Sequence, residues 1–317
     1  MKIIFSPKYT VHDRDHVFRS DKFEAALKTL LREKIIGRKD IVEAPEPSRE
    51  DLRLVHGARW VDKCLSSGFT PKDCERAELE LSPDVVLAHL MNVGGTIRAA
   101  ELALENGLGV NCGGGAHHAF ADHGEGFCLL NDIAIAVQKL IKAKKIRRAV
   151  IIDLDAHQGN GTASIFRKNK SVFTFSMHNG EIYPEKKEKS SLDIELRPGT
   201  GDGVYLALLR KNLSAALKAA KADLAVYAAG ADVYEADLLG GLKLTMSGIK
   251  KRDAFVFREC FRRKLPVAVV LGGGYAEKFK ETVRIHANTV TAAVSEWRRK
   301  ETESRPIAQL SRKLADR

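Results

Sequence analysis

An apolar run from 149 to 152 leads directly into acidic and imidazole groups. Asp153, Asp155 and His157 follow it at alternate positions. The run predicts a buried parallel strand, and side chains alternate along an extended chain, so these three are expected on one side. Ligands of open α/β sheets bind at the carboxyl ends of the strands, which makes the stretch a candidate metal site. Taken alone, it also fits an Asp-capped strand end followed by a turn.

Three further apolar runs lead into residues that can do chemistry. The run 108–112 is followed by three glycines, which permit close backbone approach to a ligand, and then by His117 and His118. The run 224–228 leads to Asp232, and the run 267–271 leads through three glycines to Tyr275. Because the carboxyl ends of parallel strands meet at one edge of a sheet, all these groups are expected at one site.

Strand and helix patterns alternate along the chain. This order predicts an α/β fold with a central, mainly parallel sheet that helices cover on both faces. Residues 1–317 are expected to form one domain whose polar end frays from about residue 300. The predicted strands are 3–6, 108–112, 149–153, 172–176, 224–228 and 266–271, and the predicted helices are 21–34, a segment from 48, 83–105, 131–143, 161–168, 204–221, 247–264 and 277–299, with 177–203 irregular.

The composition is that of an ordinary globular protein, with 44% hydrophobic residues. No apolar run approaches the roughly 20 residues of a membrane span, and the N-terminus lacks the apolar core of a signal peptide, so a cytoplasmic protein is expected. Five cysteines without a C-x-x-C pair suggest neither disulfides nor a thiolate zinc site. The net charge of +11 is scattered without interleaved aromatic residues, so no specific nucleic-acid binding is expected, while attraction to an acidic protein or membrane face stays open.

Four longer runs around these residues resemble the zinc-dependent histone deacetylase family. They are GGGAHHAFADHGEGFCLLND, IIDLDAHQGNGT, AAGADVYEADLLGG and LGGGY. With Gln158 after the candidate ligand histidine, the pattern is most similar to the class IV branch and related bacterial deacylases. The resemblance begins at the N-terminal IIFSPKY and extends to about residue 290. It implies a single arginase-like α/β domain, in agreement with the predicted order of elements.

The resemblance implies that Asp155, His157 and Asp232 bind a catalytic metal ion. Two carboxylates and one imidazole leave positions on a tetrahedral ion for water and a substrate carbonyl. Such a set suits Zn²⁺ and also accepts Fe²⁺ or Co²⁺. The ion would polarise an amide carbonyl and lower the pKa of its bound water.

The resemblance also implies the catalytic roles. His118 would act as general base toward water and then as acid toward the leaving amine, with Asn160 as its outer partner. His117, paired with Asp153, would stabilise the transition state, and Tyr275 would donate its hydroxyl to the oxyanion. A carboxylate raises the pKa of an imidazole whereas an amide does not, so His118 is expected to be the less basic histidine.

An inner monovalent-cation site, K⁺ in the family, is implied by the same motifs. Its ligands would be the side chains of Asp153 and Ser176 and the backbone carbonyls of Asp155, His157 and Met177. The alternative for Ser176 is an ordinary hydroxyl at a strand end.

The acyl-lysine tunnel of the family matches Gly126 and Phe127, although Phe127 could also be simple core. Ala116 stands where the family often has Trp or Phe, so the cavity beyond the metal is expected to be wider. Acyl groups longer than acetyl are therefore expected to be accepted. A second aromatic wall and an acidic anchor near 81–83 have no clear equivalent, and Tyr183 is the nearest aromatic residue to the former.

These observations predict a metal-dependent amidohydrolase that removes acyl groups from lysine side chains of proteins or peptides. An acetylpolyamine amidohydrolase of the same fold would need an acidic gatekeeper where this chain has the apolar Leu239. A binuclear ureohydrolase would need further bridging carboxylates. A non-catalytic acyl-lysine or nucleic-acid binder would have no use for a complete base and oxyanion donor. The oligomeric state, the native metal and the natural substrate are left open by the sequence.

Overall fold

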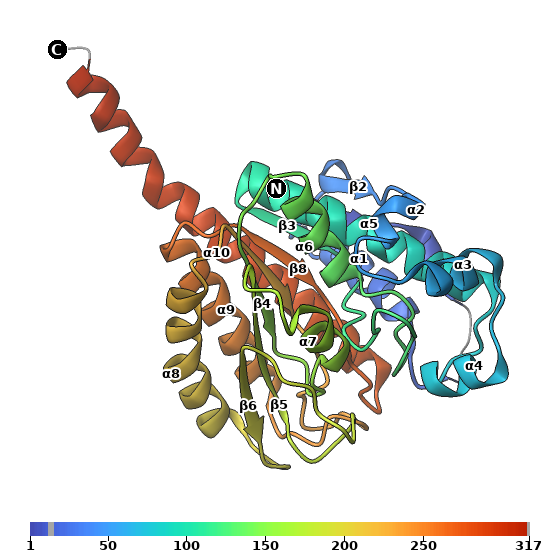
Figure 1. Ribbon diagram of the computed structural model, residues 1–317. Coiled ribbons are helices and arrows are strands. Elements are labelled where there is room, and N and C mark those ends of the chain that lie inside the picture. Colours follow the sequence, from blue (N-terminus) through green and yellow to red (C-terminus); the bar gives the residue numbers. More distant parts are fainter. Residues whose placement is uncertain (12–15, 316–317) are drawn as a thin grey trace.

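A computed structural model describes residues 1–11 and 16–315 (Figure 1). Within these residues, eight strands form one sheet in which every neighbouring pair is parallel. The predicted α/β fold is therefore confirmed. The strand order is β2-β1-β3-β8-β7-β4-β5-β6, with bounds β1 Lys2–Phe5, β2 Ile41–Glu43, β3 Leu108–Asn111, β4 Ala149–Asp153, β5 Val172–Asn179, β6 Leu192–Leu196, β7 Leu224–Ala228 and β8 Val267–Val270.

Helices cover both faces of this sheet (Figure 1). One layer contains α1, α8, α9 and α10, and the other contains α5, α6 and α7. The bounds are α1 Asp21–Arg32, α2 Arg49–Leu52, α3 Ala58–Ser66, α4 Pro71–Ala77, α5 Pro83–Asn106, α6 Asp132–Lys142, α7 Asn160–Phe166, α8 Asp202–Ala220, α9 Met246–Arg262 and α10 Phe279–Ala315, with short 3-10 turns at Pro7–Tyr9 and Arg38–Asp40.

The central strands bury side chains on both faces. On β4, Val150 and Ile152 pack into the layer of α8 to α10, whereas Ala149 and Ile151 pack into the layer of α5 and α6. This alternation explains why β4 is apolar at every position before Asp153, as expected for a parallel strand covered by helices on both sides. The carboxyl ends of β3, β4, β7 and β8 consequently meet at one edge of the sheet.

Helix α5 shows how local signals set its ends. The Ser82 hydroxyl accepts a hydrogen bond from the Val85 N–H, and Pro83 occupies the first turn, where no N–H is needed. The helix ends at Gly107, which adopts a left-handed conformation with φ 84°. The next residue begins β3, which leads into the candidate site.

Several predicted elements differ from the observed ones. The edge strands β2 and β6 were not predicted, because β2 has three residues and β6 is half-exposed with mixed polarity. The predicted helix from residue 48 is the single turn α2, followed by the separate helices α3 and α4. The last helix continues beyond 299 to Ala315 and its end projects from the body (Figure 1), while residues 316–317 lie outside the described residues.

Among the helices of the described residues, none combines the length and the hydropathy that a membrane span requires.

Candidate metal and catalytic site

Three buried side chains converge after strands β4 and β7. The candidate ligand atoms of Asp155, His157 and Asp232 all lie within 4.8 Å of one another. The Nδ1 atom of His157 is 3.2 Å from Asp155 Oδ1 and 2.9 Å from Asp232 Oδ2. The structure therefore brings together the ligand set that the sequence predicts. It has the composition of a three-ligand catalytic metal site.

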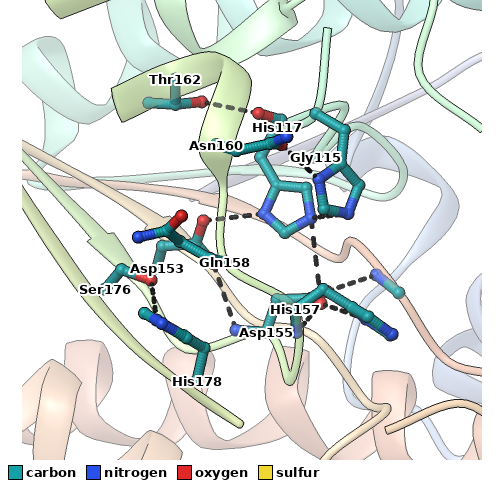
Figure 2. Close-up of polar contacts among 12 residues, drawn as sticks. Gly115, His117, Asp153, Asp155, His157, Gln158, Asn160, Thr162, Ser176 and His178 are labelled. Atoms are coloured by element: carbon teal, nitrogen blue, oxygen red, sulfur yellow. Dashed lines mark hydrogen bonds and ion pairs between the residues drawn. The ribbon is translucent and has the colours of Figure 1, made fainter. Parts of the chain in front are cut away.

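Backbone hydrogen bonds, rather than strand alternation, place these groups. Strand β4 ends at Asp153, so the expectation that alternation orients the three side chains beyond it is wrong. The Asp155 N–H donates to Asp153 Oδ1 over 3.2 Å, and the His157 N–H donates to Asp155 Oδ1 over 3.0 Å. The Ala156 N–H donates to Asp232 Oδ1 over 2.8 Å. These bonds fold the loop so that Asp155 and His157 lie beside Asp232. The Asp153 carboxylate pairs with His117 (Figure 2).

The electrostatics of the three groups fit a cation. Burial and the nearby charge of Asp155 raise the pKa of Asp232 to about 8. Burial alone would lower the pKa of His157, but its contacts with Asp155 and Asp232 raise it to about 10. Buried carboxylates need compensating positive charge, which without an ion comes from protonated His117 and from the proton on His157. A divalent ion would supply that charge and displace the proton, so the residues fit Zn²⁺.

Zinc binding should stabilise the fold. At a free Zn²⁺ concentration 100 times its Kd, the free energy of unfolding should rise by about 2.7 kcal/mol. We expect a higher Tm for the wild type in thermal denaturation with Zn²⁺ and little change for Asp232→Asn. The control Asp122→Asn makes the same substitution at an exposed aspartate and should keep the wild-type response. A wild-type Tm that Zn²⁺ leaves unchanged would contradict the metal site.

His117 lies beside Asp155 and His157 (Figure 2), and the imidazole of His118 is adjacent to it. His117 Nδ1 is 2.7 Å from Asp153 Oδ2, and His118 Nδ1 is 2.7 Å from Asn160 Oδ1. Burial lowers the pKa of His117, but the charges of Asp153 and Asp155 outweigh it and raise the pKa to about 9. Burial and the positive charges of His117 and His157 hold the pKa of His118 well below its usual value. As expected, His118 is the less basic histidine.

A buried carboxylate shapes the glycine turn before the histidines. Asp132 accepts hydrogen bonds from the Gly115 N–H over 3.0 Å and from the Ala116 N–H over 2.7 Å. The Thr96 hydroxyl donates to the same carboxylate. Gly114 and Gly115 have φ values of 71° and 96°, which glycine adopts without strain. Asp132 had no role in the sequence reasoning, although its place at the start of an apolar helix after Asn131 was a signal.

A cavity leads from the surface to His118 and His157. It is lined by Val17, Glu78, His118, Gly126, Phe127, His157, Tyr183, Leu239 and Tyr275. The Phe127 ring lies 5.8 Å from the Tyr275 ring, and the Tyr183 ring lies 5.0 Å from His118. Phe127 therefore lines the cavity rather than serving only as core, and Tyr183 provides the second aromatic wall that sequence reasoning could not place.

Tyr275 is held by a carboxylate that sequence reasoning missed. Its backbone N–H donates to Asp237 Oδ2 over 2.6 Å. The other oxygen of Asp237 accepts from the N–H groups of Leu239 and Gly240. Asp237 therefore ties the segment of Tyr275 to that of Leu239, and both side chains line the cavity.

A second cavity extends past the histidines on the side of Ala116. It is lined by Ala116, both histidines and Tyr275, and it shares Phe18, Phe23, His89 and Asn92 with a further, mainly apolar cavity. The side chain of Ala116 ends at Cβ, so it leaves this route open. Space therefore continues beyond the reacting groups.

The residues predicted for a monovalent cation lie on neighbouring strands. Asp153 on β4 is paired in register with Ser176 on β5, and Met177 is the next residue. The Ser176 hydroxyl lies 2.8 Å from His178 Nδ1 (Figure 2). The fold thus brings Asp153 and Ser176 together close to the loop of Asp155 and His157.

The parallel sheet with helices on both faces and the buried Asp-His-Asp group at its edge define an α/β protein with a candidate metal site. Residues 16–293 match the family model described as the histone deacetylase domain, so the chain belongs to the histone deacetylase family. An uncharacterized protein of Picosynechococcus sp. is 40% identical over 286 residues, which cover 90% of this chain and 95% of the relative. Histone deacetylase 2 of Arabidopsis thaliana is 34% identical over 303 residues, covering 92% of this chain and 78% of the relative.

A solved structure has the same fold. The crystal structure of the HDA15 HD domain superposes with a TM-score of 0.74, covering 94% of this chain and 90% of that one. The two sequences are 23% identical, so this comparison supports the architecture alone.

Proposed function

We propose that the chain is a metal-dependent amidohydrolase that removes acyl groups from lysine side chains of proteins or peptides. The convergence of Asp155, His157 and Asp232 beside His118, at the end of an open cavity, carries this proposal. We further propose that it acts as one catalytic domain in the cytoplasm, and that Gln158 places it near the class IV branch of the family.

Each proposed role follows from a contact in the site. Zn²⁺, or Fe²⁺ or Co²⁺, held by Asp155, His157 and Asp232 would polarise the amide carbonyl and lower the pKa of a bound water. His118 Nδ1 lies 2.7 Å from Asn160 Oδ1, an acceptor, so His118 Nε2 can act as general base toward water and then as acid toward the leaving amine. K⁺ is proposed to bind near Asp153 and Ser176.

His117 and Tyr275 are proposed to stabilise the negative charge that develops in the transition state. His117 carries a proton at neutral pH because Asp153 and Asp155 raise its pKa to about 9, although burial opposes them. It can therefore stabilise the anionic transition state beside His118. Tyr275 lines the cavity that reaches His118, and its hydroxyl can donate a hydrogen bond to the oxyanion.

The cavity past Ala116 supports acyl groups longer than acetyl. An acyl chain that leaves the reacting carbonyl on the side of Ala116 would enter the apolar cavity shared by Phe18, Phe23 and His89. Burying successive methylenes there stabilises the bound substrate by about 0.8 kcal/mol each.

Ala116→Trp should close this route. We expect kcat/KM on octanoyl-lysine peptides to fall by about tenfold or more, while kcat/KM on acetyl-lysine peptides changes by less than about threefold. Ala219→Trp, at an exposed position of α8, is the matched control and should change neither value. A strong wild-type preference for acetyl over octanoyl would contradict the longer-acyl proposal.

One observation keeps an acylpolyamine substrate as the second candidate. Glu78 is exposed and lines the cavity together with Leu239, so a carboxylate is present at the mouth although Leu239 itself is apolar. A carboxylate there could attract a second ammonium group. A panel of acyl-lysine peptides and acylpolyamines, assayed with and without a chelator, tests the choice. We expect chelator-sensitive turnover and the higher kcat/KM on the peptides, and the reverse order would replace the first proposal by the second.

A further inference from the structure

Glu125 sits on a tight turn beside the proposed general base. Glu125 and Cys128 exchange both backbone hydrogen bonds, each 2.9 Å long. Between them, Gly126 and Phe127 have φ values of 49° and 62°, as in the central residues of a type I′ turn. The same turn carries Phe127, which lines the substrate cavity. The backbone hydrogen bonds of the turn hold the backbone of Glu125 in a fixed position.

The Glu125 carboxylate continues the hydrogen-bonded chain behind His118. Asn160 Nδ2 donates to Glu125 Oε1 over 2.6 Å, while Asn160 Oδ1 lies 2.7 Å from His118 Nδ1. The Gly161 N–H also donates to Asn160 Oδ1, over 3.0 Å. Asn160 is 2% exposed, so its amide has little access to water and depends on these partners.

An ionised carboxylate at position 125 sets which group donates and which accepts in the two hydrogen bonds that link Glu125, Asn160 and His118. A side-chain amide has a donor end and an acceptor end, whereas an ionised carboxylate only accepts. Burial raises the pKa of Glu125, but hydrogen bonds from His123 and Asn160 outweigh it and hold the pKa below its usual value, so Glu125 is ionised at neutral pH. The NH₂ group of Asn160 must then face Glu125, and its oxygen must face His118.

The orientation of Asn160 in turn determines which nitrogen of His118 carries the proton. An amide oxygen accepts, so His118 must carry its proton on Nδ1, and its unprotonated Nε2 lies 3.1 Å from His117 Nε2, from which it can accept a hydrogen bond. The negative charge of Glu125 also polarises the amide and strengthens its oxygen as an acceptor. We propose that Glu125 is a positioning residue that orients Asn160 and thereby fixes the His118 tautomer needed for a base. This inference rests on the proposed amidohydrolase function.

A double-mutant cycle with reversed hydrogen-bond polarity tests the inference. Glu125→Gln should lower kcat on acyl-lysine peptides by about tenfold and leave KM unchanged. The glutamine amide has no negative charge and can donate as well as accept, so it no longer fixes the orientation of Asn160. Asn160→Asp alone should also lower kcat, because it sets a second carboxylate against Glu125. In the double variant, the introduced glutamine amide can donate to the introduced aspartate, which can accept from His118. The Glu125→Gln change should therefore raise kcat by about tenfold in the Asn160→Asp background.

Controls separate this inference from the proposed function. Glu75 lines a surface cavity together with Glu125 and Asn160, but the hydrogen bonds of the Asn160 side chain go to His118, Glu125 and Gly161, so Glu75→Gln should behave as wild type. A merely structural role for Glu125 would change kcat in the same direction in both backgrounds, and that result would overturn the inference. An inactive wild type would overturn the proposed function instead.

The ¹⁵N chemical shifts of His118 give a readout that does not need turnover. We expect a protonated Nδ1 and an unprotonated Nε2 in wild type and a mixture of tautomers in Glu125→Gln. Identical tautomers in both proteins would also overturn the inference.

Discussion

Replacing His118 with alanine is expected to lower kcat on acyl-lysine peptides by about 10²-fold to 10⁴-fold, with little change in KM. The imidazole is buried, and its environment keeps it neutral at pH 7, so it can accept a proton. Its Nδ1 lies 2.7 Å from the acceptor Asn160 Oδ1, so Nε2, which lies 3.1 Å from His117 Nε2, is the unprotonated nitrogen. Steady-state kinetics on the zinc-loaded protein would measure the loss.

Zn²⁺ binding by His118→Ala shows whether the metal site is intact in this variant. His118 does not belong to the group formed by Asp155, His157 and Asp232. His118→Ala should therefore show the same Zn²⁺-dependent increase in Tm as the wild type. A His118→Ala protein that binds Zn²⁺ and keeps wild-type kcat would show that another group acts as the base.

The central part of the fold could be predicted because its strands are apolar at consecutive positions. Such runs occur where helices bury both faces of a parallel sheet, as at β4, β7 and β8. The edge strand β6 was not predicted because it lies in the segment 177–203, which the sequence analysis interpreted as irregular. Its alternating sequence Leu192-Asp193-Ile194-Glu195-Leu196 was nevertheless a recognisable strand signal.

The ligand set could be predicted because strand ends and motifs carry it, but the supporting carboxylates could not. Asp132 and Asp237 bind backbone N–H groups of turns that exist only in the folded chain. A carboxylate with such a role has no periodicity or spacing of its own. Its sequence position alone cannot separate it from a surface aspartate.

Tyr183 shows the same limit for a tunnel residue. It belongs to the segment between β5 and β6, which has no regular pattern. Gln158 holds this segment: its side chain donates to the Glu188 carbonyl over 2.6 Å and accepts from the Glu188 N–H over 2.8 Å. A further hydrogen bond of 2.9 Å joins Gln158 to Asp193. The segment that carries Tyr183 is thus held by contacts 30 and 35 residues apart in the chain, which no local sequence pattern encodes.

Replacing Tyr275 with phenylalanine is expected to lower kcat by about 10²-fold to 10³-fold, which corresponds to about 3 to 4 kcal/mol of transition-state stabilisation. The substitution removes the hydroxyl alone. The ring can keep its contact with Phe127, and the backbone N–H can keep its bond to Asp237. Folding, Zn²⁺ binding and KM should therefore stay close to wild type, and kinetics on acetyl-lysine peptides would measure the change in kcat.

The size of this loss distinguishes an oxyanion donor from a simple tunnel wall. A wall residue contributes through its ring, which phenylalanine retains, so kcat within about twofold of wild type would remove Tyr275 from the mechanism. Tyr234→Phe is the matched control, because Tyr234 is buried but does not line the cavity. Since a donor acts only on charge that develops in the transition state, the loss should appear in kcat and not in KM.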